Sequence, residues 1–376
     1  MESKSHHINI RKLASTLSLL MLFACSQVID LPVDQGGGNV VIYGRITDGT
    51  FGNVVSVART TDQGGMPEML SGAVVKVVSE DGDEAYYLEG WREPGVYRLS
   101  ESDFRGQVGK AYHLEIEVLG KRYFTDPQVM PEVLGEDRLS WELVKERDIS
   151  DTGTSVYRDV VKIYGETSFS ELPEEFYVRW GIEETYTILG MVLPRSWFPR
   201  YTPQQCYIIN NLSEQKAFLL DGTKIRNQEL GKRLFATRPI DRSFAVKHFF
   251  NLIQSAINKE THDYWAKVNS LTVREGSIFD TPPAPVPGNI KSENPDEEVF
   301  GFFEVVDVDT ARMFMTNNDI RVWWDDPCEL NGPEWLPVFT VPFECIPCLI
   351  EERIVEETCV YCSRLPNSTL RRPVYF

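Results

Sequence analysis

The chain reads YHLEIEV over residues 112–118, turns through LGK at residues 119–121 and continues as RYF at residues 122–124. Apolar and polar side chains alternate along the first run, which is the pattern of a β-strand with one buried face. Two such runs joined by a short turn that contains glycine predict a β-hairpin. We therefore expect an all-β unit around this stretch.

Similar short runs precede this hairpin at regular intervals. They are Val40–Tyr43, Val54–Val57, Ala73–Val78, Ala85–Leu88 and Gly95–Leu99. Asp81 and Gly82 stand between two of these runs, at the position of a hairpin turn. Strands at this spacing predict a β-sandwich, which we place at residues 39–134 because Pro127 and Pro131 close the pattern.

Residues 135–376 are predicted to form a larger β-rich domain with one helical insertion. The runs with the composition of strands are Val160–Tyr164, Glu175–Ile182 and Val299–Val306. Apolar residues recur at helical spacing over 243–270, so we expect helices there, with a break at 258–263 where Thr261 caps a second, short helix. The predicted fold class is mainly β with two domains, which suits a chain of 376 residues.

The start of the chain has the pattern of an export signal. Lys4, Arg11 and Lys12 precede an apolar run over residues 13–23. A charged start, a short apolar run and a small residue before the cut are typical of a secretory signal peptide, and the run is too short to span a bilayer. We therefore expect residues 1–24 to be removed on export.

Cys25 is the candidate lipidation site. The sequence Leu22–Cys25 (LFAC) resembles a bacterial lipobox, in which the cysteine is acylated and becomes the new N-terminus. The alternative is an ordinary signal peptide with a chance cysteine. Acyl chains on Cys25 would anchor the protein to a membrane, and the glycine-containing residues 25–38 would act as a tether.

Acidic residues outnumber basic ones. Residues 1–24 hold three of the 38 Lys and Arg and one of the 56 Asp and Glu, so 35 basic and 55 acidic residues remain, with a formal charge of −20. This balance argues against a nucleic-acid partner and against a face that lies on anionic lipid. An acidic surface is equally consistent with simple solubility.

The cysteines other than Cys25 are even in number, and in an exported chain this favours disulfides. These disulfide candidates are Cys206, Cys328, Cys345, Cys348, Cys359 and Cys362. The last four form two CxxC pairs, a spacing that also allows a zinc site, but the short gap between the pairs and the oxidising compartment favour disulfides. The connectivity stays open: Cys206 and Cys328 pair with each other or with the C-terminal cluster.

Sequence signatures of catalysis are missing, because the chain has no HExxH, GxSxG, Walker or GxGxxG motif. The histidines of the mature chain, none at metal-ligand spacing from another, are His113, His248 and His262. The most suggestive cluster for ligand contact is Trp323, Trp324, Asp325 and Asp326, since exposed tryptophans beside carboxylates bind sugars or peptides. The alternative places both tryptophans in a core. We expect no catalytic residue, no cofactor and no metal.

Several stretches resemble a known family. They are Ile29–Pro32 with Asn39–Thr47, Gly95–Tyr97 with Gly109–Ile116, Pro282–Ile290 with Gly301–Phe303, and Cys359–Cys362 with Arg372–Phe376. These motifs are similar to those of the Bacteroidota lipoproteins catalogued as domain of unknown function 4249. The resemblance spans nearly all of the mature chain, and its motifs are turns and strands rather than reactive groups.

The resemblance implies an outer-membrane lipoprotein with an N-terminal immunoglobulin- or transthyretin-like module. Such proteins are often encoded beside TonB-dependent transporters, which implies a non-enzymatic accessory or ligand-binding partner of an outer-membrane β-barrel transporter, at the cell surface rather than the periplasmic face. One alternative is a fimbrial or adhesive lipoprotein processed at Arg45 or Arg59. A carboxylate-based hydrolase is a further alternative.

Overall fold

A computed structural model describes residues 38–49, 52–61, 66–99, 104–149, 153–190, 203–213, 217–272, 286–321, 349–350, 353–354 and 357–376. The predicted signal segment and Cys25 lie outside the described residues, as do Trp323, Trp324, Asp325, Asp326, Cys328, Cys345 and Cys348. The described part is mainly β, with one long helix, so the prediction of a mainly β fold is confirmed.

Every run predicted as a strand within residues 39–134 is a strand. The strands of this first unit are β1 (Val40–Thr47), β2 (Val54–Arg59), β3 (Glu68–Met69), β4 (Val74–Ser79), β5 (Glu84–Gly90), β6 (Glu93–Leu99), β7 (Ala111–Val118), β8 (Lys121–Thr125) and β9 (Gln128–Val129). Leu119 and Gly120 form the turn between β7 and β8, and both have positive φ, as tight hairpin turns require. Gly82, with φ +87°, turns the chain between β4 and β5 as predicted.

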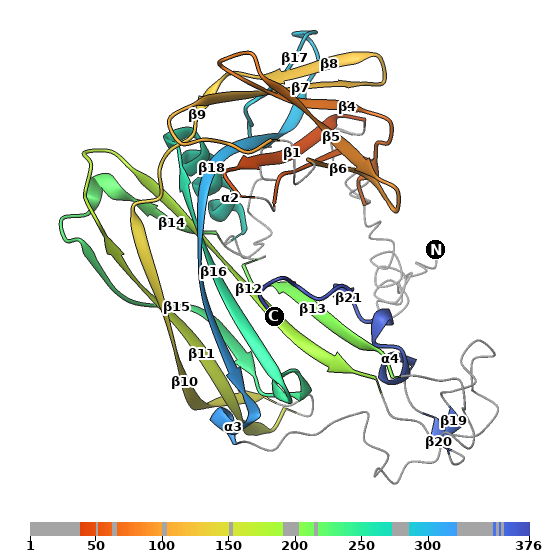
Figure 1. The fold of residues 1–376 in the computed structure, drawn as a ribbon, viewed down its shortest axis with the longest axis vertical. Helices are drawn as coiled ribbons and strands as arrows, with labels where there is room; N and C mark the ends of the chain where they lie inside the picture. The colour runs from red at the N-terminus through yellow and green to blue at the C-terminus, as the bar shows by residue number, and fades with distance from the viewer. Residues whose placement is uncertain are drawn as a thin grey trace, which may run out of the picture.

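The first unit has one apolar core, made by the inward residues of its strands. Ile42 of β1, Val75 of β4, Leu114 of β7 and Tyr123 of β8 all belong to it and are almost fully buried. Because strands from both ends of the sheet contribute to the same core, the sheet folds over on itself in the manner of a sandwich (Figure 1).

A late segment returns to this unit and joins it to the second one. Strand β17 (Ile290–Ser292) pairs with β8. Strand β18 (Val299–Thr316) runs parallel to β1 as far as Val306, and from Asp307 onward it pairs antiparallel with β16 (Lys247–Ile257). One long strand therefore carries the sheet from the first unit into the second, and β18 runs through both in Figure 1.

The second unit packs two sheets face to face. One contains β12 (Tyr177–Leu189), β13 (Gln205–Asn211), β14 (Phe218–Asp221), β16, the second half of β18 and β21 (Ser368–Thr369). The other contains β10 (Gly135–Ile149), β11 (Ser155–Phe169) and β15 (Glu229–Pro239), seen as a long separate layer in Figure 1. Ile163 and Phe235 from the second sheet meet Trp180, Ile182 and Leu252 from the first in one core.

Short elements complete the described chain. They are α3 (Asn317–Ile320), α4 (Glu357–Val360), the 3₁₀ turns η2 (Gly222–Lys224), η3 (Arg242–Phe244) and η6 (Cys362–Arg364), and the strand pair β19 (Leu349–Ile350) and β20 (Arg353–Ile354). Among the described residues, no helix has the length and apolar character needed to cross a membrane.

The helical prediction for residues 243–270 is correct only in its second half. Residues 247–257 are the central strand β16, whereas α2 (Lys259–Thr272) begins where a break was expected. Strand β16 is buried on both faces, and its apolar residues come as the adjacent pairs Phe249–Phe250, Leu252–Ile253 and Ala256–Ile257. This spacing lacks the alternation that marks a half-buried strand and resembles that of a helix. Asn258, not Thr261, caps the helix, because its Oδ1 accepts a hydrogen bond of 2.8 Å from the Thr261 backbone N–H.

Candidate functional site

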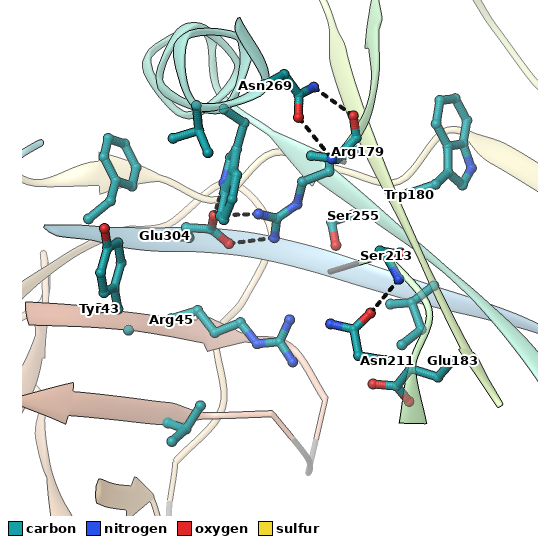
Figure 2. A pocket seen from close by; sticks show the side chains of 18 of the residues that line it. Tyr43, Arg45, Arg179, Trp180, Glu183, Asn211, Ser213, Ser255, Asn269 and Glu304 are labelled. Carbon is teal, nitrogen blue, oxygen red and sulfur yellow. Dashed lines mark hydrogen bonds and ion pairs between the residues drawn. The ribbon is translucent and has the colours of Figure 1, made fainter. Parts of the chain in front are cut away.

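A cavity of about 450 Å³ lies where the two units meet, on one face of the continuous sheet (Figure 2). Its walls come from β1 and β2 of the first unit, from β12, β13, β16 and β18, and from helix α2, which closes one side. Both units contribute side chains, so a molecule in this cavity would touch both. Its volume falls within the range of about 300–1,000 Å³ that is typical of small-ligand pockets.

The two-residue period of β-strands places the lining residues on this face. The pairs with this spacing are Tyr43 and Arg45 on β1, Gly181 and Glu183 on β12, Ile253 and Ser255 on β16, and Phe302 and Glu304 on β18. Strand register then brings the polar members together, because Arg45 lies opposite Glu304 and Ser255 lies opposite Arg179.

One ion pair in the cavity is complete within the protein. The Arg179 guanidinium donates two hydrogen bonds, of 2.7 and 2.6 Å, to the two carboxylate oxygens of Glu304. The Trp265 indole N–H also donates to Glu304, and the Arg179 guanidinium lies 4.7 Å from the centre of the Trp265 ring. Both charges are largely buried, and this geometry satisfies them. The cluster therefore holds β12, β18 and α2 together.

Two other charged side chains line the cavity, Arg45 and Glu183, and they do not form an ion pair with each other. Arg45 donates from Nε to the Gly52 carbonyl, at 2.8 Å, and forms no ion pair within the described residues. The half-buried Glu183 carboxylate has no hydrogen-bond or ion-pair partner among them. In Figure 2 the Arg45 guanidinium extends from β1 toward Glu183 and Asn211 on the opposite wall.

The pKa values of both groups move in the direction expected for incompletely compensated charges. Burial raises the pKa of Glu183, and the Arg45 charge only partly offsets this effect. Burial lowers the pKa of Arg45, although Glu304 and Glu183 oppose that shift. Each group would therefore gain from an opposite charge brought into the cavity.

Neutral polar groups and aromatic rings complete the cavity. Ser255 is 3% exposed, and its hydroxyl has no hydrogen-bond partner among the described residues. Asn211 accepts from the Ser213 backbone N–H, which leaves its amide N–H₂ available. Tyr43 and Phe302 form an aromatic wall near helix α2. The cavity therefore offers hydrogen-bond donors and acceptors beside an apolar surface, the usual make-up of a ligand site.

Glu184, the neighbour of Glu183, points to the other face of β12 and lies in a buried cluster. Its carboxylate accepts hydrogen bonds of 2.6 Å from Arg238 and 2.7 Å from Asn210, and its Oε2 lies 3.0 Å from His248 Nε2. Burial acts to raise the pKa of Glu184, but these bonds outweigh it and lower the pKa. Since both carboxylate oxygens have protein partners, this cluster stabilises the fold.

The three histidines among the described residues contact aromatic rings or carboxylates of the protein itself. His248 is fully buried between the rings of Phe244 and Phe250, at 4.1 and 4.6 Å, and burial lowers its pKa. His113 lies 3.2 Å from a Glu115 oxygen on the same strand, and His262 contacts the ring of Tyr177. Within the part of the chain that the structure describes, no group of three or more His, Cys, Asp or Glu could hold a metal ion.

Two aspartates lie at the point where β18 leaves β1. Asp48 accepts from the Val308 backbone N–H at 3.0 Å, and Asp307 accepts from the Val133 backbone N–H at 2.8 Å. Burial, together with the neighbouring Asp48 carboxyl, raises the pKa of Asp307 to about 6. The junction between the units therefore contains a carboxyl group that titrates near neutrality.

The comparison with family models decides the family. The model described as a domain of unknown function (DUF4249) matches residues 27–312. The chain belongs to this family. Every residue that lines the junction cavity lies within the matched range of the DUF4249 chain. No curated protein matches the chain.

The C-terminal part of this DUF4249 chain is tied to the second unit by a disulfide between Cys206 of β13 and Cys362, with Cα atoms 5.9 Å apart. Cys359 is also in a disulfide. The sequence left the connectivity open, and this bond joins Cys206 to the C-terminal cluster. Because both members of the second CxxC pair are oxidised, that pair does not supply zinc thiolates here.

The DUF4249 cavity residues were not nominated from the sequence, which pointed instead to Trp323–Asp326, outside the described residues. A usable signal was nonetheless present. Glu304 is the only charged residue in the run VFGFFEVV, and Arg179 interrupts the apolar run FYVRWGI. A charge inside a buried strand must be paired or must face a cavity, and both of these side chains do so.

Proposed function

We propose that this protein is a non-enzymatic, lipid-anchored binding protein of the outer membrane, an accessory to a TonB-dependent transporter. The observation that carries the proposal is the junction cavity, with its uncommitted Arg45 and Glu183 on opposite walls. A binding role requires an accessible cavity whose polar groups are not already satisfied by the protein. The Arg179–Glu304 pair meets its own needs, so Arg45 and Glu183 are free for a ligand.

The anchor and the partner are supported by the sequence. The LFAC motif ending at Cys25 supports acylation, and the glycine-containing residues 26–38 would let the two β units stand away from the membrane. The setting of similar Bacteroidota lipoproteins supports the outer membrane, the cell surface and a β-barrel transporter as partner. In this arrangement the cavity would hold the nutrient that the transporter takes up.

The same cavity also bears on the hydrolase alternative, because it holds two carboxylates, Glu183 and Glu304. A glycosidase needs both of its carboxylates free to act on the substrate. Both oxygens of Glu304 accept hydrogen bonds from Arg179, so it is not free. This arrangement favours binding over carboxylate catalysis.

The fimbrial alternative requires that a strand can be removed by cleavage. Arg45 lies in β1, which is paired with β2 on one edge and with β18 on the other. Cleavage at this point would remove a central strand and leave β2 and β18 without their shared neighbour. The position of Arg45 therefore favours a binding role for this residue.

The test is recovery of the partner from native membranes. The full chain, tagged at its C-terminus, is expressed in its own host, extracted in mild detergent and captured. We expect a β-barrel transporter to be enriched over the background of an unrelated tagged lipoprotein. The matched control is Cys25→Ser, which should leave the membrane fraction and lose the transporter. Absence of a β-barrel protein in the wild-type capture contradicts the accessory role.

A further inference from the structure

The electrostatic balance of the junction cavity restricts its ligand. Two cations and two anions line it, and the Arg179–Glu304 pair cancels within the protein. Arg45 and Glu183 stand on opposite walls, on β1 and β12, and do not form an ion pair with each other. A ligand that carries only one charge would satisfy one of these groups and remove water from the other without compensation.

A neutral ligand meets the same difficulty. When a sugar fills such a cavity, its hydroxyls accept from the guanidinium and donate to the carboxylate, but neither charge is neutralised. Sugar hydroxyls can bond to both charged groups, but only a ligand with a carboxylate and an ammonium group of its own also neutralises both charges, so the pair favours such a ligand. The planar Arg45 guanidinium suits a carboxylate in particular, because it can donate two parallel hydrogen bonds.

The remaining lining fits a short peptide backbone between the two ends. The Ser255 hydroxyl and the Asn211 amide supply a hydrogen-bond acceptor and donors for peptide groups. Tyr43 and Phe302 supply an apolar surface for small side chains. The cavity volume of about 450 Å³ limits the occupant to a few residues.

We infer that the junction cavity binds a short zwitterionic peptide, with the peptide carboxylate on Arg45 and the peptide ammonium group on Glu183. This inference rests on the proposed binding function and names its ligand class. Because the ligand touches β1 in the first unit and β12 in the second, its binding also holds the two units in one arrangement.

The experiment is calorimetric titration of the full chain, in mild detergent, with trialanine as the probe. The same titration is carried out with N-acetyl-trialanine, with trialanine amide and with maltotriose. We expect trialanine to bind, each blocked peptide to bind about tenfold or more weakly, and maltotriose not to bind, since each block removes one of the two ligand charges that neutralise Arg45 and Glu183.

Two variants assign each end of the peptide to its wall. Glu183→Gln is nearly isosteric and breaks no bond within the protein, and it should bind trialanine and N-acetyl-trialanine equally. Arg45→Gln should bind trialanine and its amide equally, and a thermal melt verifies that it folds. The matched control is Arg98→Gln, whose guanidinium pairs with Glu93 on the surface of the first unit, and it should keep wild-type affinity.

Several results would overturn the inference: no heat with trialanine at millimolar concentration, unchanged affinity for the blocked peptides, or binding of maltotriose as tight as that of trialanine. Failure here is distinguishable from failure of the accessory role. If the transporter is captured but trialanine does not bind, the ligand class is wrong. If trialanine binds with the expected dependence but no transporter is captured, the accessory role is wrong and the peptide site stands.

Discussion

The Arg179–Glu304 ion pair gives the sharpest prediction about stability. Replacing Arg179 with Met keeps an unbranched side chain of similar reach but removes both hydrogen bonds to Glu304, of 2.7 and 2.6 Å. Glu304, whose side chain is 6% exposed, would then keep only the Trp265 N–H as a hydrogen-bond donor among the described residues, with Arg45 on the neighbouring strand as a nearby cation that forms no ion pair with it. Leaving one charge of a buried pair uncompensated destabilises a protein by about 3–5 kcal/mol, and we expect a loss of free energy of unfolding in this range.

The double variant distinguishes the coupling energy of the ion pair from the cost of leaving one buried charge without a partner. When Glu304 is also replaced with Met, no buried charge is left, so most of the lost stability should return, to within about 1–2 kcal/mol of wild type. The double-mutant cycle should then give a coupling energy of at least about 2 kcal/mol. The assay is urea unfolding followed by circular dichroism.

Two results would refute this reasoning. A single Arg179→Met variant that loses less than about 1 kcal/mol would show that Glu304 is not held by the pair. A double variant that loses the sum of the two single effects would show no coupling, and the pair would not be a self-sufficient unit. In either case Arg179 and Glu304 could no longer be treated as an ion pair that is satisfied within the protein, in contrast to Arg45 and Glu183.

Three further predictions concern the disulfide, the junction carboxyl and a glycine. Replacing Cys206 and Cys362 together with Ser should reduce the free energy of unfolding by about 2–5 kcal/mol, seen as a lower urea midpoint, because the bond closes a loop between residues 156 apart in sequence. The folded-state pKa of Asp307 is raised to about 6 from a usual 3.8, so the native chain binds the Asp307 proton more tightly than the unfolded chain does. The protonated carboxyl therefore contributes its full stability below pH 3.8, and this contribution is lost as pH rises through 6. After allowance for solvent screening we expect a contribution of about 1 kcal/mol, measured by urea unfolding between pH 4 and pH 7.5. Gly301→Ala should destabilise by about 3 kcal/mol or more in a thermal melt, since φ is +105° and a Cβ would lie 1.8 Å from a backbone oxygen of β1.

Each of these predictions has its own control. An unchanged urea midpoint in the double serine variant would contradict the disulfide's role. Asp48→Asn keeps an acceptor for the Val308 N–H but removes the neighbouring acid, so it should reduce the Asp307 contribution without abolishing it, because burial is the larger cause of the raised pKa. An identical pH profile would contradict the coupling. Gly72→Ala has a positive φ of +78° but open space around it, so it should be much milder than Gly301→Ala.

The half-buried strands could be predicted from the sequence because their signal is local. In β7 the alternation of His113, Glu115 and Glu117 with apolar residues matches the observed alternation of burial. Strand β16 could not be predicted in this way, since burial on both faces removes the alternation and leaves a run that suits a helix equally well. The helix α2 that follows keeps its amphipathic spacing and was found.

The junction itself could not be predicted from the sequence. That β18 pairs with β1 up to Val306 and with β16 after Asp307 depends on partners far away in the chain. The cavity depends on the same non-local register, which brings Arg45 opposite Glu304. The sequence could have indicated these positions only as single charges in apolar strands, without showing which of them meet.

The most direct measurement is a crystal structure of the chain grown with trialanine at saturating concentration. We expect a peptide in the junction cavity, with its carboxylate within hydrogen-bond distance of the Arg45 guanidinium and its ammonium group within hydrogen-bond distance of Glu183. A cavity that stays empty of peptide, or a peptide bound only elsewhere on the surface, would contradict it.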